Sequence, residues 1–237
     1  MTQLANQRYA ESTSVTGAKS TKSSRLVDQL REAILSGELK PGSKMNLERL
    51  RRGFGVSLSP LRESLARLVA VGLVELHDNR GYTVAPVSLA NLREITRLRV
   101  EFENLALSTA IANGDVNWES DVMRSLHRLN RTHRDPDDPM TLVAWEHAHR
   151  DFHMSLLAGS GMPMLLHFCA VLHSLNDRYR RVFLVESGGD RNVPTEHSEI
   201  AQGAVARDST YACDKLREHI QRTGSNLSAR LSDTLDP

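Results

Sequence analysis

The first clear hydrophobic pattern along the chain is a pair of short helical stripes between residues 47 and 72. The first stripe predicts a helix that ends near two glycines, and its apolar positions are Leu47, Leu50 and Phe54. The second predicts a helix that Ser57 can cap and Gly72 stops, with Pro60 in the first turn, where a missing N–H costs no hydrogen bond. The apolar face of this second helix consists of Leu61, Leu65, Leu68 and Val69.

Two short runs with β character come next, at residues 73–76 and 82–85. They flank Asp78-Asn79-Arg80-Gly81, which is typical of a hairpin turn. Two helices at a tight angle followed by a hairpin form a winged helix-turn-helix, which places its second helix in the major groove of DNA. The sequence therefore predicts a DNA-binding domain near the N-terminus.

Beyond Pro86 every segment has helical periodicity, and no run is convincing as a strand. Ser88 can cap the first of these helices, which is predicted to begin at Leu89. The six predicted helices cover about 89–113, 118–133, 140–158, 164–185, 195–206 and 210–231. Short Gly- or Pro-containing breaks join them, which favours an antiparallel bundle. The predicted fold is mostly α: a winged helix-turn-helix of three helices and a small hairpin, followed by an all-α bundle.

Composition and charge divide the chain in the same way. Residues 1–22 are polar and are predicted to form a disordered tail, residues 23–86 the DNA-binding domain and residues 87–237 the helical domain. Residues 1–90 hold 13 Lys and Arg against 8 Asp and Glu, a net charge of +5, whereas the remainder holds 17 against 21, a net charge of −4. A basic head on a mildly acidic body suits a DNA-binding sensor. No apolar run has transmembrane length, and the two cysteines fit a cytoplasmic protein with buried thiols.

Three segments of the head carry a specific resemblance. Ile34–Gly42 reads ILSGELKPG, Gly55–Leu65 reads GVSLSPLRESL, and Gly72-Leu73-Val74 follows, a series that resembles the N-terminal domain of the GntR transcription factors across residues 23–86. The Ser-Pro-Leu-Arg-Glu wording and Trp118-Glu119-Ser120 resemble glutarate-responsive repressors of the FadR subgroup, and the helical body resembles the ligand-sensing FCD domain of that subgroup.

This resemblance implies a bacterial regulator, most simply a repressor, that is cytoplasmic and associated with the nucleoid when bound to DNA. It implies a palindromic double-stranded DNA operator and a homodimer, because one head covers a single half-site and two-fold operators need a two-fold protein. It also implies release by a small carboxylate, with a dicarboxylate such as glutarate as the example, and no membrane partner. An activator and a purely metal-responsive regulator are the alternatives within the class.

Nine of the ten histidines lie in the predicted helical body, and four have informative positions. His149 and His153 are four residues apart, so both imidazoles project from one face of their helix. His197 opens the fifth helix of the body and His219 lies in the sixth, and imidazoles from facing helices can enclose one divalent ion in a bundle. The remaining body histidines are interpreted as surface or satisfied core residues: His127, His133, His147, His167 and His173.

The resemblance makes these four histidines the predicted metal ligands. Phe152-His153 resembles the Phe-His motif of the family, and the segments around His197 and His219 resemble its two remaining ligand segments. His149 is a departure, because the family usually has Asp at this position. An added imidazole shifts the preference toward borderline metals, so zinc is the first choice, with nickel, copper and manganese as alternatives. Asp151 is out of phase with the pair and is predicted to be solvated.

The DNA-contacting residues follow from the same resemblance. Arg62 lies in the first two turns of the recognition helix, where it can reach a base edge, whereas the family's Arg after the turn serine is replaced by Leu58. That replacement removes one bidentate guanine contact, worth about 1–3 kcal/mol of discrimination. Arg51 and Arg52 are assigned equally to phosphate contact and to solvent, and Arg80 at the wing tip could enter the minor groove. The full predicted set is Arg49, Arg51, Ser57, Ser59, Arg62, Asn79, Arg80 and Gly81.

Arg99 interrupts an apolar helix, with Glu103 one turn later. One interpretation is a surface ion pair at i,i+4 spacing, and the other, implied by the resemblance, is an arginine that holds an effector carboxylate inside the body. The sequence favours neither interpretation of Arg99 over the other.

Enzymatic alternatives lack their motifs. The chain has no phosphate-binding glycine loop, nucleophile elbow or dinucleotide fingerprint. A metallohydrolase built on the four histidines is the one enzyme class with any support, but four protein ligands leave little room for an activated water.

Overall fold

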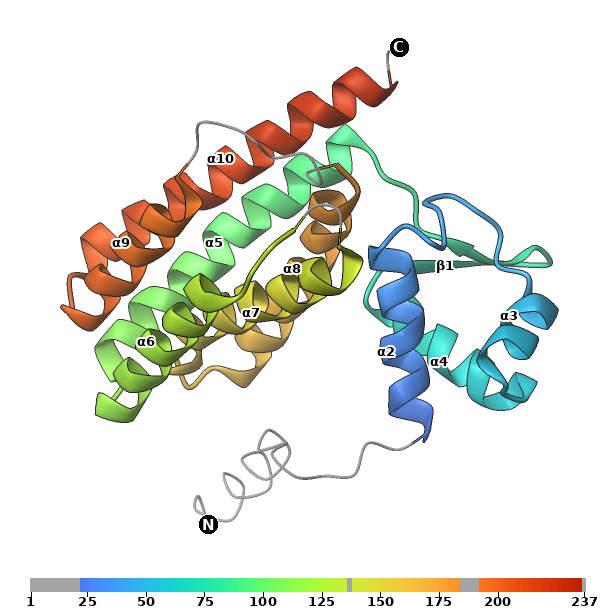
Figure 1. Cartoon of the computed structure of the whole chain (residues 1–237), viewed down its shortest axis with the longest axis horizontal. Helices are drawn as coiled ribbons and strands as arrows, with labels where there is room; N and C mark the ends of the chain where they lie inside the picture. The colour runs from blue at the N-terminus through green and yellow to red at the C-terminus, as the bar shows by residue number, and fades with distance from the viewer. Residues whose placement is uncertain (1–21, 136–137, 184–191, 236–237) are drawn as a thin grey trace.

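The computed structural model describes residues 22–135, 138–183 and 192–235, and it has two parts (Figure 1). The smaller part, here called the head, contains α2 (Lys22–Leu35), α3 (Leu47–Phe54), α4 (Leu58–Ala70), β1 (Val74–His77) and β2 (Gly81–Val84). The larger part, the body, contains α5 (Leu89–Asn113), α6 (Val116–Arg131), α7 (Pro139–Ala158), α8 (Pro163–Phe183), α9 (Val193–Val205) and α10 (Ser209–Leu235). The predicted mostly α fold is therefore confirmed. The predicted disordered tail lies outside the described residues, apart from Lys22, which begins α2.

The head is organised by the apolar face of α4, as its periodicity predicts. Leu61, Leu65 and Leu68 are fully buried, and they share one core with Leu30 and Ile34 of α2. Truncating any of these leucines to alanine would cost about 2–5 kcal/mol of stability, because each would leave a cavity in a close-packed core.

The predicted capping role of Ser57 is only half right. Ser57 does occupy the N-cap position of α4, but its side chain makes no capping hydrogen bond. Asn46 performs that function for α3, where its side-chain oxygen accepts from the backbone N–H of Arg49 at 2.9 Å. Gly55 then ends α3 with a φ of 64°, a left-handed conformation that glycine adopts without steric cost.

The hairpin differs from the prediction by one residue in each strand. Leu73 does not belong to β1, because its N–H bonds to the carbonyl of Leu68 and closes the end of α4. His77 pairs with Gly81 across the antiparallel ladder, so the turn is tighter than the sequence suggests. Asn79 and Gly81 both have positive φ, which the tight turn requires.

The body is a helical bundle without strands in its described residues, as predicted. Helix α5 runs through it and packs against α7, α8 and α10 (Figure 1). The last helix extends four residues beyond its predicted end, to Leu235, and two helices start two residues early because their capping residues precede the apolar pattern. Asp115 accepts from the N–H of Trp118 at 2.9 Å, so α6 begins at Val116, and Asn192 likewise caps α9.

The head and body meet at the C-terminal part of α8. Arg178 donates to the carbonyl of Ala85 at 2.9 Å, directly after the wing. The hydroxyl of Tyr179 donates to Asn91 at 2.8 Å and accepts from the backbone N–H of Ser88 at 3.2 Å. Ser88 caps α5 as predicted, accepting from the N–H of Asn91.

A third contact from the same turn reaches the first helix of the head, where Arg181 pairs with Glu32 of α2. Residues 178–181 are called the junction turn below. None of the helices in the described part of the chain combines the length and the apolarity that a bilayer crossing requires.

Candidate functional site

The structure brings together the four histidines that the sequence singled out. His149 and His153 project from α7, and His197 and His219 reach them from α9 and α10. All four are buried, and one ring nitrogen from each lies within 4.8 Å of the others. The i,i+4 spacing on α7 thus places two imidazoles on the inner face of the bundle, and tertiary packing adds the other two. This group is called the four-histidine cluster.

The donor set of the cluster fits a divalent metal ion. Both ring nitrogens of His153 are buried without a hydrogen-bond partner among the described residues, which is costly unless they meet a metal or a ligand. Nδ1 of His219 lies 2.8 Å from a carboxylate oxygen of Glu196, a contact that fixes the orientation of the imidazole as in many metal sites. Burial lowers the pKa of His149 and His153 well below the ordinary value, so both are neutral, as ligands must be.

A second buried group adjoins the cluster through His153. The structure brings Glu103 of α5 and His173 of α8 close to His153, with Nε2 of His173 3.3 Å from the Glu103 carboxylate. Arg99 pairs with Glu103 at 2.6 Å. Burial would raise the pKa of Glu103, but Arg99 and His173 together lower it to about 2, so the carboxylate is ionised. The predicted i,i+4 pair therefore exists, but its predicted surface location is wrong.

Arg180 approaches the cluster from the junction turn. Its Nη1 lies 2.6 Å from Nδ1 of His149, and its Nη2 faces the carboxylates of Glu146 and Asp177. The ring of His149 also stacks on Trp145 at 4.9 Å. Burial raises the pKa of Glu146, and the nearby Arg180 opposes that increase. A guanidinium held by two carboxylates thus contacts one of the candidate ligands.

Sequence reasoning missed four residues of this region. Glu103 and His173 had been interpreted as a surface partner and an ordinary histidine, and Glu196 and Arg180 had no role. The one available signal for Arg180 was the group of three arginines, Arg178, Arg180 and Arg181, near the end of a helix whose earlier part is largely apolar. The other predictions for this region fit the structure: Asp151 is exposed and pairs with Arg128 at 3.2 Å, and the four remaining body histidines are exposed.

The two thiols give no sign of reactivity. Cys169 is buried and Cys213 is half-buried, and both are free. Burial raises the pKa of Cys169 to about 12, which keeps the thiol protonated. This agrees with the structural role predicted for them.

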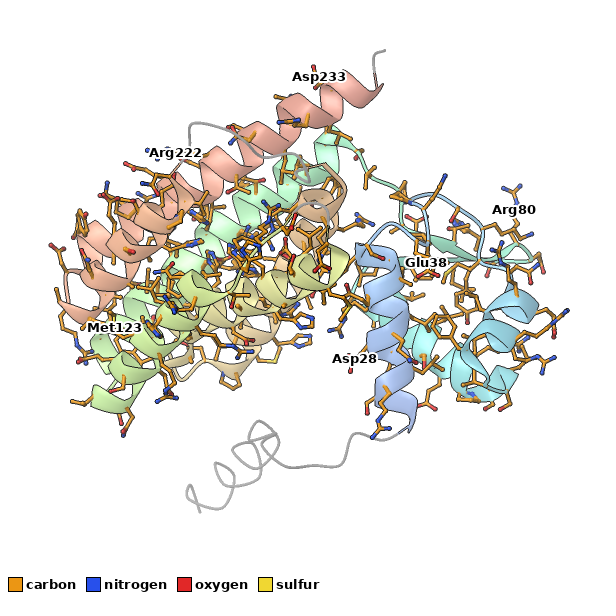
Figure 2. All side chains as sticks on the ribbon, in the orientation of Figure 1. Asp28, Glu38, Arg80, Met123, Arg222 and Asp233 are labelled. Carbon is orange, nitrogen blue, oxygen red and sulfur yellow. The ribbon has the colours of Figure 1, made fainter. Side chains whose placement is uncertain are left out.

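The predicted DNA-contacting residues lie on the exposed surface of the head. Arg62 on α4, Arg49 on α3 and Arg80 in the wing are exposed, and none has an ion-pair partner within the described residues. Arg80 lies at the outermost end of the wing, on the side of the head that points away from the body (Figure 2). Ser57 and Ser59 are also exposed, at the start of α4, and Asn79 and Gly81 form the wing turn with Arg80.

Several arginines of the head have carboxylate partners, among them Arg52, which lies 3.9 Å from Glu48. Arg51 pairs with Glu48 at 3.0 Å, and it can contact phosphate only if it leaves that pair. Arg67 lies late on the recognition helix and pairs with Glu63 at 2.8 Å. Leu58, which replaces the family's arginine, is exposed at the first position of α4 and offers no hydrogen-bonding group there.

Comparison with known proteins gives matches over both parts of the chain. Residues 22–84 match the family described as "Bacterial regulatory proteins, gntR family", and residues 94–222 match the FCD domain. The HTH-type transcriptional regulator BphR of Paraburkholderia xenovorans is 36% identical over 197 residues, which cover 81% of this chain and 80% of BphR. The HTH-type transcriptional repressor GlaR of Escherichia coli is 32% identical over 197 residues, which cover 81% of this chain and 89% of GlaR.

The solved structure of E. coli McbR/YncC has the same fold. It superimposes with a TM-score of 0.73 at 23% identity, and the match covers 90% of this chain and 99% of the other. A GntR regulator structure from Rhodococcus sp. RHA1 gives a TM-score of 0.70 at 19% identity over 89% of this chain and 99% of the other.

Proposed function

Because the chain belongs to the GntR family of bacterial transcriptional regulators and carries an FCD domain, we propose that it is a repressor that binds a palindromic operator as a homodimer and leaves it when a small carboxylate binds beside a divalent metal. The chain is a ligand-responsive regulator and not an enzyme, since the matched families and relatives are regulators. The metallohydrolase alternative is therefore dropped. As a DNA-binding regulator it would act in the cytoplasm, on the nucleoid.

The four-histidine cluster is the observation that carries this proposal. Four neutral imidazoles inside a bundle suit a borderline divalent ion, with zinc as the first choice and nickel, manganese or copper as alternatives. Such an ion would supply a Lewis-acid position for an anion. Glu196 orients His219 for coordination, and neither ring nitrogen of the neighbouring His153 has a hydrogen-bond partner among the described residues.

Arg99 is proposed to hold the far carboxylate of a dicarboxylate effector such as glutarate. Its buried guanidinium lies 3.3 Å from Nε2 of His173, whose ring centroid lies 5.0 Å from that of His153. A second carboxylate would share this guanidinium with Glu103, which already accepts from Nε and Nη2. Arginine suits that arrangement because its planar guanidinium has several N–H donors and can bond to two acceptors at once.

A repressor role is supported by GlaR, a relative whose name states that it is a repressor. The test is a mobility shift with the DNA fragment upstream of the protein's own gene, with zinc present. We expect binding without effector and release by millimolar glutarate, and a tenfold loss of affinity requires about 1.4 kcal/mol of coupling. Transcription that rises with metal alone and ignores glutarate would favour a metal-responsive activator instead.

The homodimer is proposed to form through an apolar patch on α5 and α8. Leu105 and Phe168 are 51% and 47% exposed, Met164 is also exposed, and the rings of Phe102 and Phe168 meet edge to face at 6.3 Å. These four residues are called the apolar patch. Contiguous exposed apolar surface of this kind is typical of protein interfaces.

A second copy of the chain is the partner favoured by the charges beside the patch. Arg97 and Glu101 are both exposed on α5, two turns and one turn before Leu105, respectively. In a two-fold contact each surface meets itself, so an adjoining pair of opposite charges is self-complementary.

Phe168→Glu is expected to convert the dimer into a monomer, because a charge in the patch would have to be desolvated on association. Sedimentation or light scattering would show the change, and operator affinity would fall with it since one half-site would be lost. Met123→Glu is the matched control, because Met123 is 41% exposed on α6 (Figure 2) and belongs to no part of the patch. A Phe168→Glu protein that remains dimeric would place the interface elsewhere.

A further inference from the structure

Arg180 contacts the four-histidine cluster, although it is not among the candidate ligands. Its Nη1 lies 2.6 Å from Nδ1 and 3.2 Å from Nε2 of His149. Its Nη2 donates to Asp177 at 2.8 Å and to Glu146, and all four side chains are buried. One imidazole nitrogen of a candidate ligand is therefore an acceptor for a guanidinium.

That hydrogen bond cannot coexist with a ligated His149. A neutral imidazole has one nitrogen with a free lone pair, and its other nitrogen carries a proton. Coordination through Nδ1 would need the position that Arg180 occupies. Coordination through Nε2 would leave a proton on Nδ1, facing the Nη1 donor of Arg180. In both cases Nη1 loses its acceptor, and an unpaired buried donor on a cation is costly.

The charges around the cluster favour binding of an anion beside the metal and Nη1 of Arg180. Four neutral imidazoles bring no negative charge to a divalent ion. Glu103 is ionised but paired with Arg99 at 2.6 Å, and Glu196 pairs with Arg222 at 2.9 Å. A carboxylate at the metal would supply negative charge, and its remaining lone pairs would offer Nη1 of Arg180 a new acceptor.

We infer that Arg180 is the residue that recognises the metal-proximal carboxylate of the effector. The inference rests on the proposed function and deepens it, because it assigns the two ends of the effector to different arginines. Arg99 has Nε and Nη2 engaged by Glu103 whether or not His149 is ligated, so ligation frees no donor there. Ligation of His149 releases Nη1 of Arg180, whose Nε already lacks a hydrogen-bond partner among the described residues, so metal binding adds a second donor for the carboxylate.

The test uses the full-length protein and two separate titrations. The first measures zinc affinity by competition with a chelator in a buffer without carboxylates, and the second measures acetate and glutarate affinity of the zinc-loaded protein by calorimetry. The variants are Arg180→Lys, which keeps a cation beside Glu146 and Asp177, and Arg180→Gln with Glu146→Gln, which removes one buried charge of each sign. Arg150→Lys is the control, since Arg150 bonds to Ser174 and to the carbonyl of Ala170 instead.

The two affinities are expected to change in opposite directions. Zinc should bind both Arg180 variants as tightly as the wild type or more tightly, because no guanidinium bond to His149 has to break. Acetate and glutarate should bind them at least about tenfold more weakly, as loss of a charge-assisted hydrogen bond implies. The Arg150→Lys control should match the wild type in both titrations.

Three results would overturn the assignment. Unchanged carboxylate affinity in either Arg180 variant that folds would remove Arg180 from the effector site and leave the proposed function intact. A parallel fall in zinc and carboxylate affinity would show that Arg180 only supports the structure. A zinc-loaded wild-type protein that binds neither acetate nor glutarate would overturn the carboxylate effector itself, and with it this assignment.

Discussion

Saturating zinc is expected to raise the melting temperature of the wild-type protein by roughly 8 to 16 °C. A ligand that binds only the folded state adds about 4 kcal/mol when its free concentration exceeds Kd about a thousandfold. For a chain of this size each kcal/mol shifts the melting temperature by roughly 2–4 °C. The physical source is the set of buried imidazoles, among them His153, whose nitrogens have no hydrogen-bond partner within the described residues. Calorimetric scans with zinc and with chelator measure the shift.

His153→Ala should abolish most of this shift, because a buried ligand at the centre of the cluster is lost. His167→Ala is the matched control, since His167 is exposed on α8 and should leave the shift unchanged. A wild-type protein whose melting temperature ignores zinc, nickel and manganese would end the metal proposal. Metal analysis of the same samples should give about one ion per chain, as one cluster of four ligands implies.

Arg62→Ala is expected to reduce operator affinity by about fivefold to 150-fold, because one good base contact is worth about 1–3 kcal/mol of discrimination. Arg62 is exposed on α4 and has no ion-pair partner in the part of the chain that the structure describes, so its guanidinium is available to a base edge. Affinity for a scrambled duplex at the same salt concentration should change little. Equal losses on the two duplexes would reassign Arg62 to the phosphate backbone.

Arg51→Ala provides the contrast. It should reduce affinity for the operator and for the scrambled duplex by similar factors, and the loss should be smaller than the operator loss of Arg62→Ala. A phosphate contact carries no sequence information, and Arg51 must first leave Glu48, which lies 3.0 Å away. Arg67→Ala is the control, because Arg67 pairs with Glu63 late on α4 and should not affect either duplex. A shallower salt dependence for the Arg51 variant would confirm the lost phosphate contact.

Local patterns predicted the fold well because they depend on near neighbours along the chain. The buried face of α4 and the pair His149 and His153 both follow from helical periodicity. Helix starts were less accurate, since Asp115 and Asn192 cap their helices before the apolar pattern begins. These errors concern polar residues whose hydrogen bonds an apolar pattern does not register.

Of the site, only the residues that belong to recognisable sequence motifs were predicted. That His197 and His219 would meet the α7 pair came from resemblance, because nothing in their spacing fixes how α9 and α10 pack. Arg180 and Glu103 were missed because their importance depends on partners from other helices, 31 residues away in the case of His149 and Arg180. A charged residue that is buried can contact the site, whereas the same residue on the surface is solvated, and a single sequence does not show which residues are buried.

The junction turn has a consequence for protein engineering. Residues of this one turn of α8 contact a side chain of α2, through Glu32, and the main chain directly after the wing, at Ala85 and Ser88. A chimaeric regulator that joins this body to a foreign head would retain the main-chain contacts, since every chain offers a carbonyl and an amide there. The ion pair would be kept only if the foreign α2 carried an acidic residue at the position of Glu32. The residue at the position of Glu32 can therefore be chosen before a fusion is built, together with the apolar residues of the head core that pack against Leu175 of α8.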